Sequence, residues 1–187
     1  RFDKNIVVVH DLAFLEHPEW FSNSFVRLYR NLVPKAIRKA RAVITVSEFS
    51  KNRIVELLGI PTEKVFTAYQ GIDPTFYPVA QEEIERVTQK FAITRPYLLF
   101  VGSIAPRKNL ATALAAFGQM KRKLSSKHIM VIAGVNSFQF PKVDVPTNIT
   151  DGVKVIGYAN DNDLPGLYSG ADLLVYPSLY EGFGLPP

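Results

Sequence analysis

The chain contains no cysteine among its 187 residues. This absence excludes disulfide bonds, thiolate nucleophiles and cysteine-ligated zinc, and it suits a reducing compartment. There is also no apolar run near the roughly 18 residues of a membrane-spanning helix. No signal peptide is visible, and a start at Arg1 inside an apparent strand leads us to expect that the native N-terminus is missing. His, Asp and Glu residues do not cluster at ligand spacing, so we expect no metal site.

What is present describes a folded protein with an excess of positive charge. Hydrophobic residues make up 47% and charged residues 21%, which is ordinary globular usage. The net charge of +5 favours anionic partners such as nucleotide phosphates, anionic lipid headgroups or nucleic acid. Because no aromatic–basic stacking platform accompanies the charge, we do not expect nucleic-acid binding.

Apolar strands alternate with amphipathic helices along the chain, as in parallel α/β sheets. The expected strands are residues 6–9, 42–46, 65–68, 97–101, 129–133, 153–156 and 173–176. The expected helices are residues 24–41, 47–58, 81–91, 109–124 and 163–169. We place one domain at residues 1–80, a linker region at 81–96 and a second domain at 97–187. Each domain is expected to be part of a Rossmann-like fold.

A glycine-rich loop follows the last strand, with Glu181 directly before Gly182-Phe183-Gly184. In α/β sheets, ligands bind beyond the carboxyl ends of the strands, where this loop would lie. Glycines there leave backbone N–H groups open to a ligand. A short glycine pattern is a weak signal, so a simple tight turn with a solvated Glu181 remains open.

A second candidate site is the turn from Gly102 to Asn109, between a strand and a helix. A helix start is an anion site because its first N–H groups are unpaired and carry partial positive charge. Arg107 and Lys108 add two cations where the helix dipole alone would disfavour them. The pattern favours an anionic ligand, with two solvated charges as the alternative.

Two further features have both ordinary and functional interpretations. His10 follows the first strand and is either a hydrogen-bonded core residue or a residue of the site. The helix at 24–41 carries basic residues around its apolar stripe, which is either a solvated face or a surface for anionic membranes.

The sequence resembles the retaining glycosyltransferases of family 4, the group 1 glycosyltransferases with the GT-B fold. The resemblance covers nearly the whole chain. It is carried by His10-Asp11-Leu12, Val46-Ser47-Glu48-Phe49-Ser50-Lys51, Gln70-Gly71-Ile72-Asp73, the segment from Phe100 to Asn109, and Glu181-Gly182-Phe183-Gly184-Leu185-Pro186-Pro187. Glu181 would open the family's Glu-x7-Glu motif, whose second Glu would fall past Pro187. We therefore expect a fragment of a longer protein. The implied fold is two Rossmann-like domains facing a cleft, each only partly present here.

The resemblance also implies roles for individual residues. Arg107 and Lys108 would hold the donor diphosphate and stabilise the leaving group. Glu181 would bind sugar hydroxyls, and His10 would meet the transferred sugar. The expected substrate-binding residues are Gly102, Ser103, Tyr158, Gly182, Phe183, Gly184 and Leu185.

The implied reaction is retaining transfer of a hexosyl group to a hydroxyl acceptor, in polysaccharide or glycolipid assembly. The donor would be a GDP- or UDP-linked sugar, which serves as co-substrate, and no separate cofactor is expected. The motifs His10-Asp11 and Arg107-Lys108-Asn109 resemble those of mannosyltransferases, which favours a mannosyl donor. We expect a cytoplasmic protein, with peripheral contact at the inner face of the membrane through residues 24–41 as an option. The alternatives are a non-catalytic nucleotide-binding regulatory module, and an epimerase or phosphorylase that shares the GT-B architecture.

Overall fold

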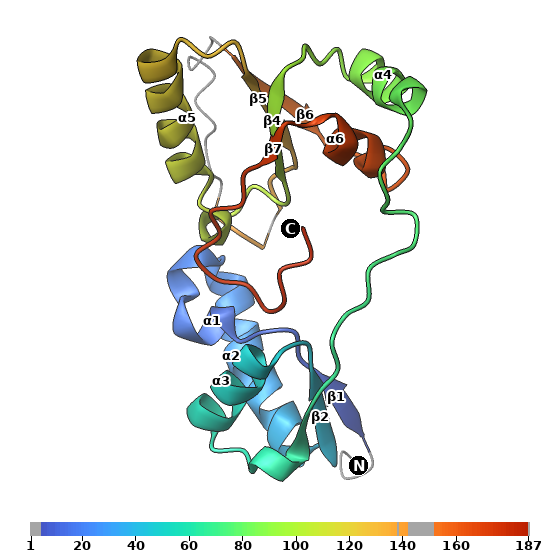
Figure 1. Cartoon of the computed structure of the whole chain (residues 1–187). Coiled ribbons are helices and arrows are strands. Elements are labelled where there is room, and N and C mark those ends of the chain that lie inside the picture. The colour runs from blue at the N-terminus through green and yellow to red at the C-terminus, as the bar shows by residue number, and fades with distance from the viewer. Residues whose placement is uncertain (1–4, 138, 142–151, 187) are drawn as a thin grey trace. The chain divides into compact units, whose positions relative to one another are not determined.

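The computed structural model describes residues 5–137, 139–141 and 152–186. It divides into two compact units, labelled by their elements in Figure 1. Unit 1 contains the described residues up to Gly71, the segment 139–141 and the segment Tyr180–Leu185. Unit 2 contains the remainder, beginning at Ile72. Both units are parallel α/β structures, as the alternation of strands and helices predicts.

Unit 1 is built on a three-stranded parallel sheet in the order β1-β2-β3. Its strands are β1 (Ile6–Val8), β2 (Ala42–Thr45) and β3 (Val65–Thr67). Its helices are α1 (Ala13–Glu16), α2 (Asn23–Lys39) and α3 (Glu48–Leu58), with the short 3-10 turns η1 (Pro18–Trp20) and η2 (Thr62–Lys64). Ser47 caps α3 by accepting the Ser50 N–H at 3.1 Å, and Gly59 ends it in the left-handed conformation, as their positions in the sequence predict.

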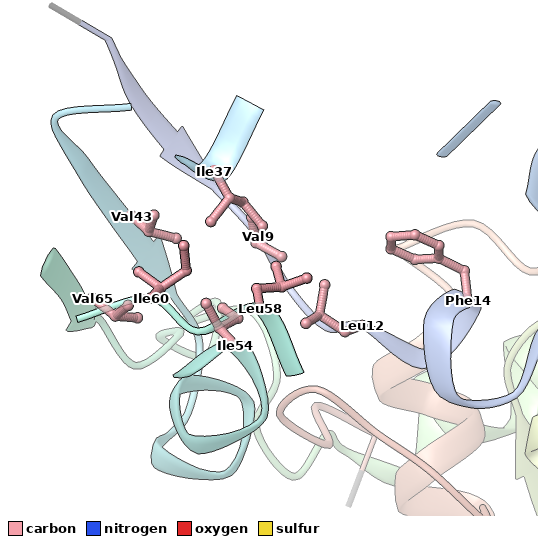
Figure 2. Packing of buried hydrophobic residues seen from close by; sticks show 9 residues of the cluster. All are labelled: Val9, Leu12, Phe14, Ile37, Val43, Ile54, Leu58, Ile60 and Val65. Carbon is pink, nitrogen blue, oxygen red and sulfur yellow. The ribbon is translucent and has the colours of Figure 1, made fainter. Parts of the chain in front are cut away.

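The core of unit 1 lies between the helices and one face of the sheet. Figure 2 shows Ile37 of α2 and Ile54 of α3 near Val43 and Val65, which point to the same face of β2 and β3. The alternate residues Ile6, Val8 and Phe66 belong to the other face and are 60%, 57% and 55% exposed. Parallel sheets are usually covered on both faces. In the described part of this unit, helices cover only one.

Unit 2 is built on a four-stranded parallel sheet in the order β6-β5-β4-β7. Its strands are β4 (Tyr97–Val101), β5 (Ile129–Ala133), β6 (Val153–Gly157) and β7 (Leu173–Leu174). Its helices are α4 (Gln81–Lys90), α5 (Leu110–Leu124) and α6 (Leu164–Gly170), with the 3-10 turn η3 (Pro106–Lys108). Strand β7 is shorter than the predicted 173–176, although the Val175 N–H still bonds the Leu99 carbonyl at 2.7 Å.

Helices cover both faces of this second sheet, α5 on one side and α4 with α6 on the other (Figure 1). Alternate residues of β4 serve the two cores. Leu98 and Phe100 pack with α5, while Tyr97 and Leu99 pack with α4 and α6. Because successive side chains of a strand point to opposite faces, one fully apolar strand supports both layers.

The structural division differs from the expected domains at 1–80, 81–96 and 97–187. The boundary lies between Gly71 and Ile72. Helix α4, within the expected linker, belongs to unit 2, where Val87 is fully buried and lies against α6 at Gly166. Segment Tyr180–Leu185 groups with unit 1 because Tyr180 is hydrogen-bonded to Glu16 and the Gly182 carbonyl to Ser47, both in that unit.

An ion-pair cluster joins α4 to the start of α6. The Asp163 carboxylate is only 2% exposed and accepts hydrogen bonds from Arg86 at 3.1 Å and from Lys90 at 2.6 Å. Burial would raise the pKa of Asp163, but the bonds from Lys90 and Arg86 outweigh it, so its pKa is lowered from the ordinary 3.8. The ionised form of Asp163 therefore stabilises the folded state.

We predict that Asp163→Asn lowers the free energy of unfolding by about 1–2 kcal/mol at pH 7, because the ion pairs with Arg86 and Lys90 are lost. The loss is no larger because both partners can regain contacts with water. A lowered folded pKa means that the contribution is complete above the ordinary value and disappears as pH falls through the folded value. Urea unfolding at pH 7 and below pH 3 measures this difference. The control is Asp161→Asn, at an exposed position on the same loop. A wild-type advantage that does not shrink at low pH would contradict the ionic origin.

Candidate functional site

In unit 2, the order in which successive strands join the sheet reverses at β4. From β4 the chain proceeds outward to β5 and then β6, and it returns through α6 to place β7 on the other side of β4. In open α/β sheets, ligands bind at the carboxyl ends of the strands where such a reversal occurs. The two segments that leave these ends are the turn after β4, which begins at Gly102, and the segment after β7.

The turn after β4 depends on two glycines. Gly102 has φ +139°, a conformation that side chains rarely adopt, and its N–H bonds the Ala133 carbonyl at 3.0 Å. A Cβ on Gly134 would lie 1.9 Å from the Gly102 carbonyl oxygen. Two neighbouring strands thus leave the sheet with their backbones in close contact. Ser103 is half-buried in the same turn.

Lys108 is the buried cation of this site, with 6% of its surface exposed. Its Nζ lies 3.3 Å from the Tyr176 hydroxyl and 5.0 Å from the centre of that ring. Its Cε lies 3.4 Å from the position that a Gly102 Cβ would take. The structure therefore brings the predicted residues Gly102 and Lys108 together at the carboxyl end of β4.

Arg107 and Lys108 lie in η3, immediately before α5. Asn109, which we expected to be helical, has φ 55° instead, and α5 begins at Leu110. Asn tolerates this left-handed conformation better than most residues. The cations and the first N–H groups of a 15-residue helix are thus adjacent in the chain, as an anion site requires.

In unit 1, the glycine-rich loop contacts the segment after β1. A Cβ on Gly182 would lie 2.5 Å from the His10 carbonyl oxygen, so only glycine allows this approach. The Gly182 carbonyl accepts hydrogen bonds from the hydroxyls of Ser47 at 2.5 Å and Ser50 at 3.3 Å. Ser50 also bonds the His10 carbonyl at 3.0 Å. The His10 side chain is exposed, and Glu181 is half-buried.

Tyr180 anchors the loop immediately before Glu181. Its side chain is 8% exposed, and its hydroxyl donates to a Glu16 carboxylate oxygen at 2.8 Å. Arg53 pairs with the other oxygen of Glu16. Burial would raise the pKa of Glu16, but the bonds from Arg53 and Tyr180 outweigh it and lower that pKa. Burial and the neighbouring Glu16 carboxylate raise the pKa of Tyr180.

Some other predicted residues are more exposed. Tyr158 is 70% exposed at the end of β6, which is the edge strand and lies two positions from β4. Phe183 is 37% exposed, with its ring centre 6.2 Å from that of Tyr69. Gly184 has φ +94° and open space around it, and Leu185 is 48% exposed. In the described residues, no three His, Asp or Glu side chains gather as metal ligands would.

The structure therefore pairs Gly102 with Lys108 in unit 2, and the backbone of His10 with Gly182 in unit 1. The meeting of both pairs in one cleft concerns the relative placement of two units and stays a prediction. Sequence reasoning missed several supporting contacts. The Ser47 hydroxyl both caps α3 and bonds the Gly182 carbonyl, a contact between residues far apart in the sequence. Glu16, Gly134 and Tyr176 carry no local motif that marks them.

Comparisons with known proteins agree over both units. Residues 81–187 match the family model of glycosyl transferases group 1, and residues 4–76 match that of glycosyltransferase family 4. A curated relative is the O-antigen chain mannosyltransferase B of Escherichia coli, 28% identical over 100% of this chain and 50% of its own length. Another is the O-antigen chain mannosyltransferase RfbU of Salmonella typhimurium, 27% identical over 97% of this chain and 47% of its own length.

Solved structures show the same fold. HepE of Anabaena, in complex with UDP-glucose, is 20% identical, with a TM-score of 0.73 over 97% of this chain and 49% of that one. WaaG, a glycosyltransferase involved in lipopolysaccharide biosynthesis, is 18% identical, with a TM-score of 0.70 over 99% of this chain and 54% of that one. The expected GT-B fold class is thus confirmed. The chain spans about half the length of these proteins.

We predict that Gly134→Ala disrupts the turn after β4, because its Cβ would collide with the Gly102 carbonyl. The expected result is destabilisation by about 1–3 kcal/mol, typical of overpacking, together with weaker binding of UDP or GDP by the whole protein. Thermal unfolding and calorimetric titration measure the two effects. The control is Gly118→Ala within α5, which meets only the flexible end of Arg122 and should stabilise that helix. Unchanged nucleotide binding in Gly134→Ala would show that the turn does not form the phosphate site.

Proposed function

The chain belongs to the group 1 glycosyltransferases, and we propose that the whole protein transfers a hexosyl group from a nucleotide diphosphate sugar to a hydroxyl acceptor. The observation that carries this proposal is the buried Lys108 beside the Gly102 turn, at the strand reversal where α/β sheets bind ligands. Arg107 and the start of α5 add positive potential at the same place. A diphosphate is the part of the donor that fits such a site.

The proposed roles of the site residues follow from the place where charge develops during the reaction. When the bond from the sugar to the diphosphate breaks, negative charge builds on the leaving phosphate. Arg107 and Lys108 are proposed to stabilise that charge, an effect that contributes several kcal/mol when the donors are held in place beforehand. Glu181 would hold sugar hydroxyls, and His10 would meet the transferred sugar. The N–H groups of residues 182–185 would line the donor site. Transfer is proposed to proceed with retention, as the family resemblance implies.

The donor and the pathway are narrower inferences. Relatives in two bacteria are named as O-antigen chain mannosyltransferases, which supports a mannosyl donor and a role in polysaccharide assembly. The HepE complex contains UDP-glucose, so both UDP- and GDP-linked sugars belong in the test. We propose no separate cofactor. The non-catalytic regulatory alternative gains no support from relatives that are named as transferases.

A lipid-linked acceptor is compatible with the outward side of α2. Leu28 and Leu32 are 53% and 56% exposed there, and they share that side with the exposed Lys35 and Lys39. Apolar and cationic side chains on one side of a helix fit an anionic bilayer surface. We infer a peripheral contact with the inner face of the cytoplasmic membrane. No helix in the described residues is long and apolar enough to cross a bilayer.

The proposed function is tested with the whole protein and a panel of UDP- and GDP-linked sugars, with products identified by mass spectrometry. Lys108→Ala is predicted to lower kcat by about 100-fold, and donor affinity much less, because its charge acts mainly as the bond breaks. Arg107→Lys should also lower kcat if the guanidinium binds phosphate through two bonds. Lys123→Ala removes the same charge at the other end of α5 and serves as the control. Lost donor affinity with unchanged kcat in Lys108→Ala would assign Lys108 to ground-state binding alone.

The membrane contact is tested by vesicle flotation. The wild-type protein should bind phosphatidylglycerol vesicles in low salt and bind phosphatidylcholine vesicles poorly. Replacing Leu28 and Leu32 with Ser and Lys35 and Lys39 with Glu should weaken that binding at least about tenfold, since each basic residue near the surface contributes about 1 kcal/mol. The control changes Lys123 to Glu and the exposed Leu124 to Ser, at the end of α5. Equal flotation of both variants would remove α2 from the contact.

A further inference from the structure

The segment after β7 is hydrogen-bonded to every residue of the Arg107–Asn109 turn. We call this segment, residues 176–179, the strap. The contacts are Leu179 N–H to the Arg107 carbonyl (2.8 Å), Lys108 Nζ to the Tyr176 hydroxyl (3.3 Å) and Asn109 Nδ2 to the Pro177 carbonyl (3.2 Å). Both partners lie in unit 2, at the carboxyl ends of the adjacent strands β4 and β7. The strap therefore sets the position of the turn that carries the two cations.

Tyr176 is the member of the strap that reaches the ammonium itself. A lysine side chain has four rotatable carbon–carbon bonds, and fixing them costs up to about 2 kcal/mol of conformational entropy. Tyr176 holds the end of this chain in two ways, through its hydroxyl at 3.3 Å and through its ring face at 5.0 Å. Gly102 also lies against the end of the side chain, since a Cβ on Gly102 would be 3.4 Å from Lys108 Cε and 3.7 Å from Nζ. The ammonium is thus held at one place before any ligand arrives.

We propose that Tyr176 is a positioning residue that preorganises the Lys108 ammonium for the terminal phosphate of a nucleoside diphosphate. This inference rests on the proposed function, because it takes the Arg107–Lys108 turn as the diphosphate site. Preorganisation lowers the ordering cost of binding and places the charge where it is needed. The contribution of Tyr176 should therefore concern the phosphate that Lys108 contacts and leave the base, the ribose and the first phosphate unaffected.

The experiment compares diphosphate with monophosphate binding in the whole protein. Calorimetric titrations of UDP and UMP, and of GDP and GMP, give the preference for the second phosphate. Tyr176→Phe keeps the ring and loses the hydroxyl, so it should reduce that preference about 3–10-fold. Tyr176→Leu loses both contacts and should reduce it about 10–30-fold. Monophosphate affinity should change less than twofold in either variant. Lys108→Ala gives the full loss of the preference for comparison. Free UDP and GDP already carry on the terminal phosphate the charge that the donor gains only as its bond breaks, so this loss is compatible with a small change in donor affinity.

A purely structural role for Tyr176 is separated by a matched tyrosine. Tyr97 in β4 is fully buried, and its hydroxyl bonds the Leu167 carbonyl at 2.7 Å. Tyr97→Phe should lower thermal stability and leave the diphosphate preference unchanged. If Tyr176→Phe behaves in the same way, the positioning role is wrong. Should Tyr176→Leu fail to fold, the Phe variant still decides between the two roles.

The outcomes also distinguish this inference from the proposed function. A preference that is lost in Lys108→Ala but intact in both Tyr176 variants overturns the role of Tyr176 alone. A wild-type protein that binds diphosphate no better than monophosphate overturns both, because the turn is then no diphosphate site. Graded loss from Tyr176→Phe to Tyr176→Leu to Lys108→Ala is the result that supports the inference.

Discussion

The position of β4 between β5 and β7 is the constraint on which the candidate phosphate site depends. Because the chain grows from β4 to one side and returns on the other, two unrelated segments leave the sheet next to each other. One supplies Gly102 and the cations, and the other supplies Tyr176. Neither segment forms the arrangement alone. The hydrogen bonds of β4 to both neighbours therefore do more than hold the sheet together, since they also set the distance between the ammonium and its tyrosine.

The geometry of the candidate site also requires two places where one backbone segment passes very close to another. Gly134 lets β5 pass against the Gly102 carbonyl, and Gly182 lets the glycine-rich loop lie against the His10 carbonyl. A side chain at either position would meet a carbonyl oxygen that cannot move without moving its own strand end. These glycines differ from Gly184, which has open space around it. At Gly184, glycine is favoured because its positive φ is a conformation that side chains rarely adopt. Backbone geometry at the candidate site thus relies on missing side chains as much as on those present.

Sequence periodicity predicted most of the elements because strands and helices are encoded locally. The strands at Tyr97–Val101 and Ile129–Ala133 were predicted to the residue, as continuous apolar runs between clear breaks. Strand β7 was predicted too long, because its apolar run continues after the ladder ends. Among the candidate residues, Gly102 and Lys108 were predicted from a strand–turn–helix pattern; the structure places them in contact, and their roles stay predictions. Tyr176 and Glu16 were missed, since each acts through a partner that is distant in sequence, and apolar or charged context alone gives no sign of it.

The cations of α4 offer a comparison for the proposed role of Tyr176. Arg86 and Lys90 face the buried carboxylate of Asp163, which ties α4 to α6, and Arg86 also pairs with Glu83, so that two carboxylates match the two cations within the fold. A carboxylate in the place of Tyr176 would bind the Lys108 ammonium too, but it would also repel an incoming phosphate. A tyrosine fixes the position of an ammonium through a hydroxyl and a ring face without adding negative charge. For the proposed role, the residue at this place has to hold the cation and still allow an anion to bind, and the uncharged side chain of tyrosine meets both conditions.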